Sequence, residues 1–382
     1  MEITFKNAGQ RNTAPFRADM VGSFLRPRAL KEARRKFERR EISAGELRKV
    51  EDAEIVKLVE KQQAIGLQAV TDGEFRRSWW HLDFMWGLEG VEKRSIAKGY
   101  QFQGEETRAE TAGLTGKIRF GDHSMLKDYQ FLRTAAGDAV IARQTIPAPA
   151  QFLAELQRGG NQAITSAVYD NAEELIADIA AAYRDAIQAF YTAGCRNLQL
   201  DDCTWGMLCD KAYWEERQQQ GVDAAAIARL YARVNREAIQ GRPSDMAITL
   251  HVCRGNYHST WAASGGYEPV AEVLFDIAGV DGFYLEFDTE RAGDFAPLRF
   301  IKDQQVVLGL VSSKNGELER KEDIIARLAE AAEFVPIDQL CLSPQCGFAS
   351  TEEGNILTEE QQWAKLRLIK EVAGEVWPAK PV

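Results

Sequence analysis

Eight short runs of apolar and β-branched residues, separated by amphipathic segments, constrain the fold of this 382-residue chain more than any other feature. Between the runs, apolar residues recur three or four positions apart, which is the spacing of a helix with one buried face. Strands that are apolar throughout and alternate with helices are typical of a parallel sheet covered by helices. The pattern predicts an α/β fold, a single closed (β/α)8 TIM barrel over residues 1–382. We expect its strands at residues 18–25, 69–75, 142–149, 197–203, 246–253, 282–288, 305–312 and 339–346.

One segment departs from this alternation. Residues 80–141 are longer than a crossover helix requires, and they contain the short alternating runs GYQFQ and KIRFG. Alternation of apolar and polar residues predicts strands with one exposed face. We therefore expect a hairpin and short helices inserted after the second strand, over the mouth of the barrel.

The net charge of the chain limits the classes of partner that it can bind. The chain has 57 acidic and 47 basic residues and a formal net charge of −10, which repels phosphate backbones and argues against nucleic acid as a partner. It contains no run of about 18 apolar residues and no apolar run behind a basic start, so we expect no membrane association and a cytoplasmic location. In such a protein the six cysteines should be reduced thiols.

Polar and charged residues that are costly to bury lie at the ends of the expected strands. In a (β/α)8 barrel the active site lies at the carboxyl ends of the strands, and buried charges there must be paired or bound to a metal. The sequence therefore predicts an active site at this rim. The residues in question are Ser23, Glu74, Asp201, His251, Cys253, Glu286 and Cys346.

Four of these residues form a candidate metal site. His251 and Cys253 are two positions apart on one strand, so their side chains point to the same face. Glu286 ends the next strand, and Cys346 follows the last one. Two thiolates, an imidazole and a carboxylate are a ligand set that suits Zn²⁺.

Other residues near the strand ends have competing interpretations. Cys203 and Cys209 could serve as rival ligands, but we interpret them as packing residues because buried free cysteines are common. Trp79, Trp80 and Trp205 follow charged strand ends and could form a wall against a flat ligand, or could simply belong to the core.

The two acids Glu74 and Asp201 also allow two interpretations. They could form salt bridges to Arg76, Arg77 or Lys211. Alternatively, they could recognise a cationic group of a substrate, such as an α-amino group, through charge-assisted hydrogen bonds.

At these residues the sequence resembles the catalytic barrel of cobalamin-independent methionine synthase, and in particular its short, single-barrel members. The resemblance extends over nearly the whole chain and includes relatives that methylate other thiols with the help of zinc. The motifs that carry it are VGSFLRP at 21–27, VTDGEFRR at 70–77, LQLDD at 198–202, HVC at 251–253, YLEFD at 284–288 and SPQCGF at 344–349.

The resemblance implies a role for each strand-end residue. The zinc ligands of the family match His251, Cys253, Glu286 and Cys346. The acids that hold the amino group of homocysteine match Glu74 and Asp201, and the serine whose backbone contacts that amino acid matches Ser23. The implied cofactor is Zn²⁺, and the implied partners are a small-molecule thiol and a methyl donor.

The sequence departs from the family on the donor side. The N-terminal barrel that helps to bind polyglutamated methylfolate in the longer enzymes has no counterpart in this chain. Residues 145–152, TIPAPAQF, contain no Trp to stack on a pterin, and Lys314 lies near the position of a histidine thought to protonate the folate. We therefore expect no dependence on a polyglutamate tail and keep two donors open, a methylfolate or a methylcorrinoid on a partner protein, which the 80–141 insertion could dock.

The expected reaction is methylation of a thiol, most simply homocysteine to methionine. The thiolate is the nucleophile, and a zinc ion deprotonates a bound thiol. Glu286 would be the weak ligand that the substrate sulfur replaces, and Lys314 would act as a fixed positive charge. Three alternatives stay open: alkylation of another thiol such as coenzyme M, including epoxide-opening or corrinoid-linked reactions; a zinc- or thiol-binding barrel without turnover; and a metal-free barrel resembling uroporphyrinogen decarboxylase.

Overall fold

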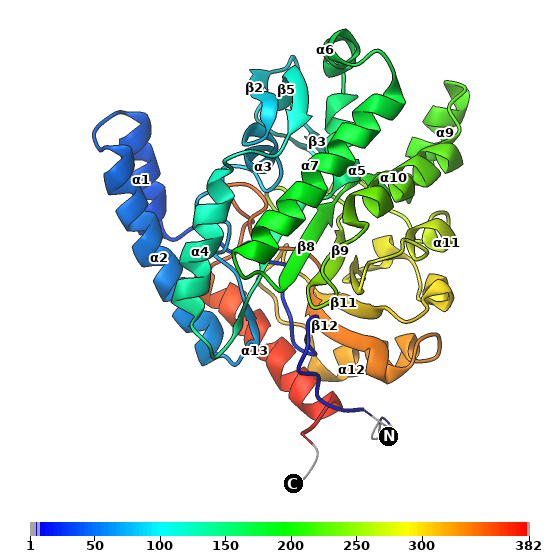
Figure 1. Cartoon of the computed structure of the whole chain (residues 1–382). Coiled ribbons are helices and arrows are strands. Elements are labelled where there is room, and N and C mark those ends of the chain that lie inside the picture. The colour runs from blue at the N-terminus through cyan, green and yellow to red at the C-terminus, as the bar shows by residue number, and fades with distance from the viewer. Residues whose placement is uncertain (1–4, 6–7, 380–382) are drawn as a thin grey trace.

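Parallel strands form the centre of the computed structural model, which describes residue 5 and residues 8–379 (Figure 1). Six of them make one sheet in chain order, with every neighbouring pair parallel. These strands are β7 (Gln144–Pro147), β8 (Asn197–Asp202), β9 (Ala247–Val252), β10 (Gly282–Glu286), β11 (Gln305–Val311) and β12 (Leu340–Pro344). A second parallel pair joins β1 (Ala69–Val70) to β6 (Ile141–Ala142), which precedes β7 by one residue. The fold is thus mixed α/β around parallel strands.

Of the expected strands, one is absent from the described residues and another is much shorter than the sequence suggested. Over 18–25 the described chain has no strand, only a parallel bridge from Ala18 to Leu342. The reason is local: the carboxylate of Asp19 accepts hydrogen bonds from the backbone of Phe16 and Met20, so these N–H groups do not join a ladder. The strand expected at 69–75 ends at Val70, ahead of a turn in which consecutive residues 73 and 74 have φ of 68° and 62°.

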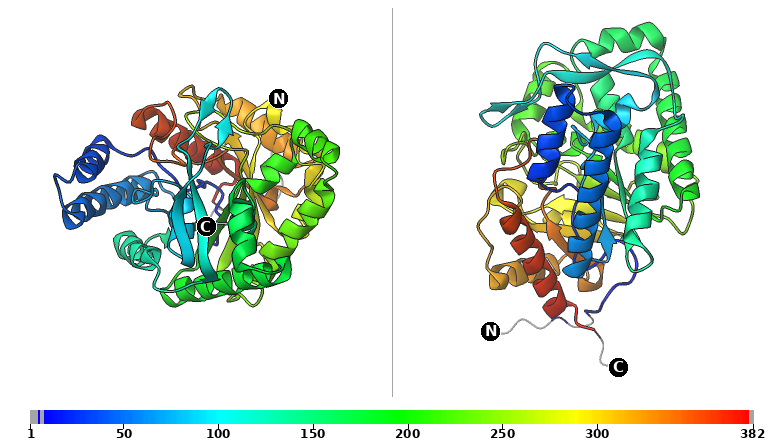
Figure 2. Two further views of the ribbon diagram at one scale, coloured as in Figure 1. Left: turned by 90° about the horizontal axis from the view of Figure 1, so that it is seen from above. Right: turned by 90° about the vertical axis from the view of Figure 1, so that its left-hand side faces the viewer.

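Helices cover the sheet on its outside (Figure 2). α2 packs on β1, α4 on β6, α12 on β11 and α13 on β12. The α-helices include α1 (Arg28–Glu38), α2 (Ala44–Ala64), α4 (Ser124–Ala136), α5 (Pro149–Leu156), α7 (Ala172–Thr192), α10 (Ala224–Ile239), α12 (Lys321–Ala331) and α13 (Glu359–Val376). Capping boxes start α2, at Ser43 and Glu46, and α13, at Thr358 and Gln361, and they satisfy backbone N–H groups that a helix start leaves free.

Short helices occupy the connections nearest the carboxyl ends of the strands. The chain from β9 to β10 contains only the four-residue α11, and the chain from β10 to β11 contains 3₁₀ turns in place of an α-helix. The remaining elements are α3 (Leu82–Trp86), α6 (Asn161–Val168), α8 (Thr204–Leu208), α9 (Lys211–Gln219), α11 (Ala271–Leu274), η1 (Glu290–Ala292), η2 (Ala296–Phe300) and η3 (Ile337–Gln339). These irregular connections bring loop backbone and side chains close to the strand ends.

Residues 80–141 contain antiparallel strands. β2 (Glu89–Ser95) pairs with β5 (Glu110–Arg119), and β3 (Gln101–Phe102) pairs with β4 (Glu105–Glu106). Gly104, with φ of 77°, makes the turn between β3 and β4 in a conformation that favours glycine. β2 and β5 stand at the top of Figure 1, on the side away from the lower end of α13.

A polar cluster fills the interior between the strands. Arg143 contacts the carboxylate of Asp19 at 2.6 Å, and the hydroxyl of Tyr284 donates to the same carboxylate at 2.8 Å. All three side chains are buried. The pairing satisfies charges that would be costly if they stood alone.

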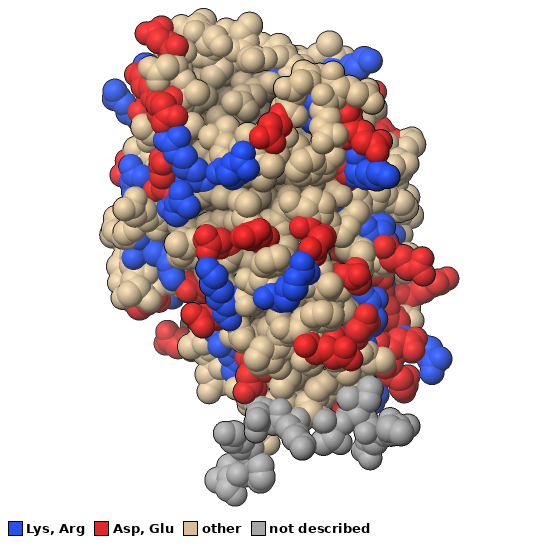
Figure 3. Space-filling view, turned by 90° about the vertical axis from the view of Figure 1, so that its right-hand side faces the viewer, with Lys and Arg blue, Asp and Glu red and all other residues tan. Residues whose placement is uncertain are grey.

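The molecular surface is charged but mixed. On the face seen in Figure 3, acidic and basic side chains are interspersed. Within the described residues, no helix is long and apolar enough to cross a membrane.

Candidate active site

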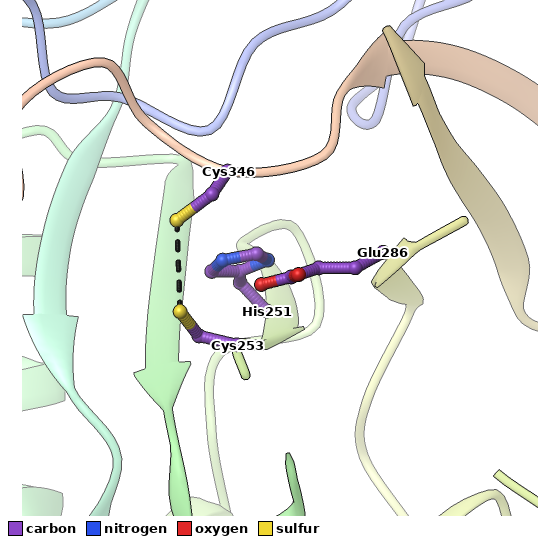
Figure 4. A group of neighbouring side chains, drawn as sticks. All are labelled: His251, Cys253, Glu286 and Cys346. Atoms are coloured by element: carbon purple, nitrogen blue, oxygen red, sulfur yellow. Dashed lines mark hydrogen bonds between the residues drawn. The ribbon is translucent and has the colours of Figure 1, made fainter. Parts of the chain in front are cut away.

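Four side chains from three strand ends meet in one cluster (Figure 4). His251 lies in β9 and Cys253 follows that strand, Glu286 ends β10, and Cys346 follows β12. Their ligand atoms all lie within 4.8 Å of one another, and all four residues are buried. The Sγ atoms of Cys253 and Cys346 are 3.6 Å apart. These are the four residues that the sequence suggested as metal ligands.

His251 is oriented with one nitrogen free. Its Nδ1 lies 3.3 Å from the carbonyl oxygen of Tyr284. A carbonyl can only accept, so Nδ1 is the donor in this contact, and in the neutral imidazole Nε2 would hold the lone pair. Nε2 is buried and has no hydrogen-bond partner among the described residues. A buried lone pair beside two thiols is the arrangement that a metal ligand requires.

The two thiols favour a cation between them. The neighbouring thiol of Cys203 and burial raise the pKa of Cys253 well above its usual value, although the contact with Cys346 opposes this. The contact with Cys253 and burial do the same for the pKa of Cys346. Two adjacent buried thiolates repel each other, and a divalent cation would remove that repulsion and bind both.

Glu286 is held as a carboxylate. Its Oε1 accepts the backbone N–H of Arg254 at 2.8 Å, and its Oε2 lies 3.0 Å from Nη2 of Arg291. Burial by itself raises the pKa of Glu286, but the charges of Lys314, Arg254 and Arg291 outweigh it and hold that pKa below its usual value. The group is therefore ionised and available as an oxygen ligand.

A cavity of about 860 Å³ opens beside the cluster. His251, Cys253 and Cys346 line it, and so do the three residues expected to bind the substrate, Ser23, Glu74 and Asp201. The fold therefore brings the acids and the thiols to one cavity wall. Glu286 and Lys314 are not among the described residues that line it, although the carboxylate of Glu286 belongs to the cluster.

Glu74 satisfies one oxygen and leaves the other free. Its Oε1 accepts from the hydroxyl of Thr145 at 3.0 Å and lies 3.4 Å from Nη1 of Arg77. Its Oε2 is buried and has no partner within the described part of the chain. The salt bridge that we considered from the sequence is therefore present, yet an acceptor remains. Glu74 also has φ of 62°, a strained conformation for a residue with a side chain, and such strain clusters at functional sites.

Asp201 lies in the same electrostatic environment as Glu74. Its Oδ1 accepts from Nε2 of Gln199 at 2.7 Å. Burial, and next the charge of Glu74, raise the pKa of Asp201 well above its usual value. Burial likewise raises the pKa of Glu74, against the opposing charge of Arg77. A cationic group bound between the two carboxylates would favour the ionised form of both.

Ser23 packs against the loop that carries Cys346. The backbone N–H of Phe348 donates to the carbonyl of Ser23 at 3.0 Å, and the N–H of Ala349 donates to its Oγ at 3.3 Å. Gly347 permits this approach, because a Cβ at that position would lie 1.9 Å from Oγ of Ser23. The first segment of the chain is thus fixed beside a metal-ligand candidate.

Lys314 is buried and its ammonium group is fully engaged. It donates to Oδ1 of Asn256 at 2.9 Å, to the carbonyl of Thr260 at 3.1 Å and to the carbonyl of Gly255 at 3.3 Å. An ammonium has three protons, and all three have acceptors here. The side chain anchors the loop that follows Cys253, and its charge lowers the pKa of Glu286.

Part of the cavity wall is aromatic, and the sequence interpretation anticipated Trp80 there but missed the other rings. Tyr100, Phe102 and Tyr257 line it together with Trp80, and the rings of Phe102 and Tyr257 lie 5.5 Å apart. Tyr100 and Phe102 come from the run GYQFQ, where alternation places them on one face. That spacing was a usable signal, but the sequence does not say which surface the face covers.

The remaining candidates fall on both sides of our interpretation. Trp79 and Trp80 line the cavity, whereas Trp205 is buried and is not among the described residues that line it. Cys203 also lines the cavity, and its contact with Cys253 makes it more than a packing residue. Cys209 is buried.

The parallel α/β fold and this cluster together define a known protein family. The family model described as cobalamin-independent synthase, catalytic domain, matches residues 16–375, and the chain belongs to this family.

Individual relatives agree with the family assignment. The uncharacterized protein YxjH of Bacillus subtilis is 52% identical over 377 residues, which cover 97% of this chain and 98% of that protein. The methionine synthase of Saccharolobus solfataricus is 22% identical and covers 86% of each chain.

Solved structures are similar over nearly the whole chain. A crystal structure from Listeria monocytogenes has a TM-score of 0.75 and 43% identity, and covers 96% of this chain and 99% of that one. The B12-independent methionine synthase of Shewanella sp. W3-18-1, in complex with selenomethionine, has a TM-score of 0.70 at 18% identity, with coverage of 94% and 97%. At that identity the likeness concerns the fold.

Proposed function

We propose that this protein is a zinc-dependent methyltransferase that methylates the thiol of homocysteine to form methionine. The observation that carries the proposal is the shared cavity wall. On it, the thiol and imidazole candidates lie beside two buried carboxylates, one of which has a free oxygen.

The residues present fit a zinc ion. His251 offers a buried nitrogen lone pair, Cys253 and Cys346 offer adjacent sulfurs, and Glu286 offers an ionised carboxylate. When bound there, zinc would lower the pKa of a thiol so that the sulfur is nucleophilic at neutral pH. The chain itself fixes the ligands, through the carbonyl of Tyr284 for His251 and the backbone N–H of Arg254 for Glu286.

Glu74 and Asp201 select the acceptor. An α-amino group bound between them would satisfy the free oxygen of Glu74 and offset the repulsion between the two carboxylates. A sulfonate such as that of coenzyme M would meet like charges at the same place. The pair therefore favours an amino-acid thiol, and alkylation of coenzyme M remains the alternative outcome of the test below.

The aromatic part of the cavity wall is suited to binding the methyl donor. Aromatic rings from Tyr100, Phe102 and Tyr257 offer stacking surfaces, and they could serve the donor in place of the Trp that residues 145–152 lack. We propose a flat aromatic donor such as a methylfolate, without dependence on a polyglutamate tail, and we keep a methylcorrinoid protein as the alternative.

The architecture that we propose for this function is one domain, a closed (β/α)8 barrel with residues 80–141 inserted at its mouth. Residues near the N-terminus support closure on both sides. The N–H of Asp19 donates to the carbonyl of Leu342 at 2.9 Å, and the N–H of Phe24 donates to the carbonyl of Gly73 at 3.1 Å. Since the proposed substrates are small soluble metabolites, we expect the enzyme to act in the cytoplasm.

A donor–acceptor matrix on zinc-loaded protein tests the proposal. Triglutamyl methylfolate, monoglutamyl methylfolate and methylcobalamin are each combined with homocysteine or coenzyme M, and Cys346→Ser serves as the inactive control. Methionine should form from homocysteine. Methylation of coenzyme M instead would move the function to that acceptor, and zinc binding without turnover in every combination would leave a binding protein. A strong preference for the triglutamate that Lys314→Ala abolishes would contradict our interpretation of the donor.

A further inference from the structure

Both oxygens of Glu286 already have partners supplied by the chain. Oε1 accepts the backbone N–H of Arg254, and Oε2 lies 3.0 Å from the guanidinium of Arg291. The backbone of Glu286 is fixed too, because its N–H donates to the hydroxyl of Tyr267 at 2.8 Å and its carbonyl accepts from Nη1 of Arg254 at 3.2 Å. Only the carboxylate of this residue is free to change partners.

Arg291 is placed to serve two carboxylates. It comes from η1, five residues after Glu286, and its Nη2 lies 3.0 Å from Oδ1 of Asp288 as well as 3.0 Å from Oε2 of Glu286. Its guanidinium lies over the ring of Trp261, 5.1 Å from the centroid. Oδ2 of Asp288 is buried and lacks a partner in the described ranges. One cation is thus shared between two buried acids.

The contact of Arg291 with Glu286 contributes a different stabilisation in two states of the site. When Glu286 ligates a metal, part of its charge is neutralised by that metal and Arg291 can remain with Asp288. When a substrate sulfur takes the place of the carboxylate, Glu286 becomes a full negative charge with no exposed surface. A buried charge without a partner is strongly disfavoured, so Arg291 stabilises the second state more than the first.

The contact between Glu286 and Arg291 also lies outside the set of residues that line the cavity. His251, Cys253 and Cys346 line the cavity, whereas neither Glu286 nor Arg291 is among the described residues that do. A sulfur that arrives through the cavity would reach the metal site at the three residues that line it, whereas the contact between Arg291 and the carboxylate is made by two residues that do not. Glu286 could therefore keep its contact with Arg291 while the sulfur takes its place at the metal.

We propose that Arg291 is a positioning residue for ligand exchange, which receives the carboxylate of Glu286 when the thiol of the acceptor displaces it from the metal. This inference rests on the proposed function. It assigns to Arg291 an effect on thiol binding and none on the binding of the metal itself.

The test uses Co²⁺ in place of Zn²⁺ in the full-length protein, because sulfur bound to Co²⁺ gives a charge-transfer absorption that reports each added thiolate. Homocysteine is titrated into the parent, Arg291→Gln, Arg291→Lys and Asp288→Asn. Arg299→Gln serves as the matched control, since Arg299 forms a surface ion pair with Glu268 on the neighbouring turn. Chelator competition measures metal affinity without thiol.

In Arg291→Gln, metal stoichiometry and affinity should be kept, while the half-saturating homocysteine concentration should rise about 10- to 100-fold, as expected for loss of a charge-assisted contact. Arg291→Lys should recover the greater part, because a single positive charge is enough for a carboxylate. Asp288→Asn should lower the half-saturating concentration, because it removes the competing acid. The control should match the parent.

An unchanged half-saturating concentration in Arg291→Gln would overturn the inference, and so would loss of the metal before any thiol is added. If Arg291→Gln does not fold, Arg291→Lys and Asp288→Asn still test the inference. Unchanged thiol binding in both of these variants would contradict it. If the parent itself gains no absorption with homocysteine, the proposed function fails and the inference falls with it. A response in the parent that Arg291→Gln shares removes the inference alone.

Discussion

The sulfur atoms of Cys253 and Cys346 lie 3.6 Å apart although 93 residues separate them along the chain. Neither takes part in a disulfide bond, since all six cysteines are free. The contact joins the end of β9 to the end of β12, and it places two soft ligands at the spacing that a single ion can bridge.

We predict about one equivalent of zinc per chain and its loss when either sulfur is replaced. Cys253→Ser and Cys346→Ser remove a thiolate ligand and should retain little zinc, measured by metal analysis after dialysis against a weak chelator. Cys341→Ser is the matched control, because Cys341 lies on β12, the strand that leads to Cys346, but outside the cluster. Full zinc in Cys346→Ser would remove this residue from the ligand set.

The two carboxylates on the cavity wall should affect acceptor binding and not zinc binding. Glu74→Gln and Asp201→Asn should weaken homocysteine binding about 10- to 150-fold, the value of a lost charge-assisted hydrogen bond, as measured by calorimetry on zinc-loaded protein. Asp202→Asn is the control, because Asp202 accepts from Thr204 and does not line the cavity. Unchanged binding in both test variants would give these acids another task and favour coenzyme M.

Asp202 should also make stability depend on pH. Burial, opposed by hydrogen bonds from Thr204 and others, raises the pKa of Asp202 from 3.8 to about 6. The folded protein therefore binds this proton more tightly than the unfolded chain, so the contribution is fully present below about pH 4 and is lost as pH rises to about 6. The loss is on the order of 3 kcal/mol. Urea unfolding at several pH values should show this slope in the parent and a flatter one in Asp202→Asn; an identical slope would contradict the assignment.

Removal of one aromatic ring from the cavity wall should weaken binding of the methyl donor alone. Phe102→Ala removes a ring that packs against Tyr257, and the KM for the methyl donor should rise about 2- to 10-fold while homocysteine binding is unchanged. Phe37→Ala, on the exposed face of α1, is the control. An unchanged donor KM in Phe102→Ala would place the donor outside the cavity, as a methylcorrinoid on a partner protein would require.

The metal-ligand candidates were predictable because strand periodicity fixes them. An imidazole and a thiol two residues apart on a strand share a face, and the ends of neighbouring parallel strands meet at one rim. His251, Cys253, Glu286 and Cys346 obey these two rules, and the fold brings them together. Glu74 and Asp201 follow from the same rim.

The rest depended on contacts that a sequence does not encode locally. The backbone over 18–25 bonds to its own Asp19 side chain, so an apolar run there did not become a strand. Tyr100 and Phe102 reach the cavity only because the β3–β4 hairpin packs near the loop after β9, where the N–H of Gln103 donates to the carbonyl of Trp261. Arg291 pairs with Glu286 through a 3₁₀ turn, where a regular barrel would have an α-helix.

The hydrogen bonds between residues 17–19 and β12 also bear on how the molecule is made. The N–H of Leu342 donates to the carbonyl of Arg17, and the guanidinium of Arg17 donates to the carbonyl of Leu340 at 2.7 Å. These partners are more than 320 positions apart, so on a translating ribosome the first of them waits until more than 320 further residues have been added. Until then, the edge of the early strands stays open to neighbouring nascent chains, and a chaperone that covers this edge would have its greatest effect on yield during synthesis.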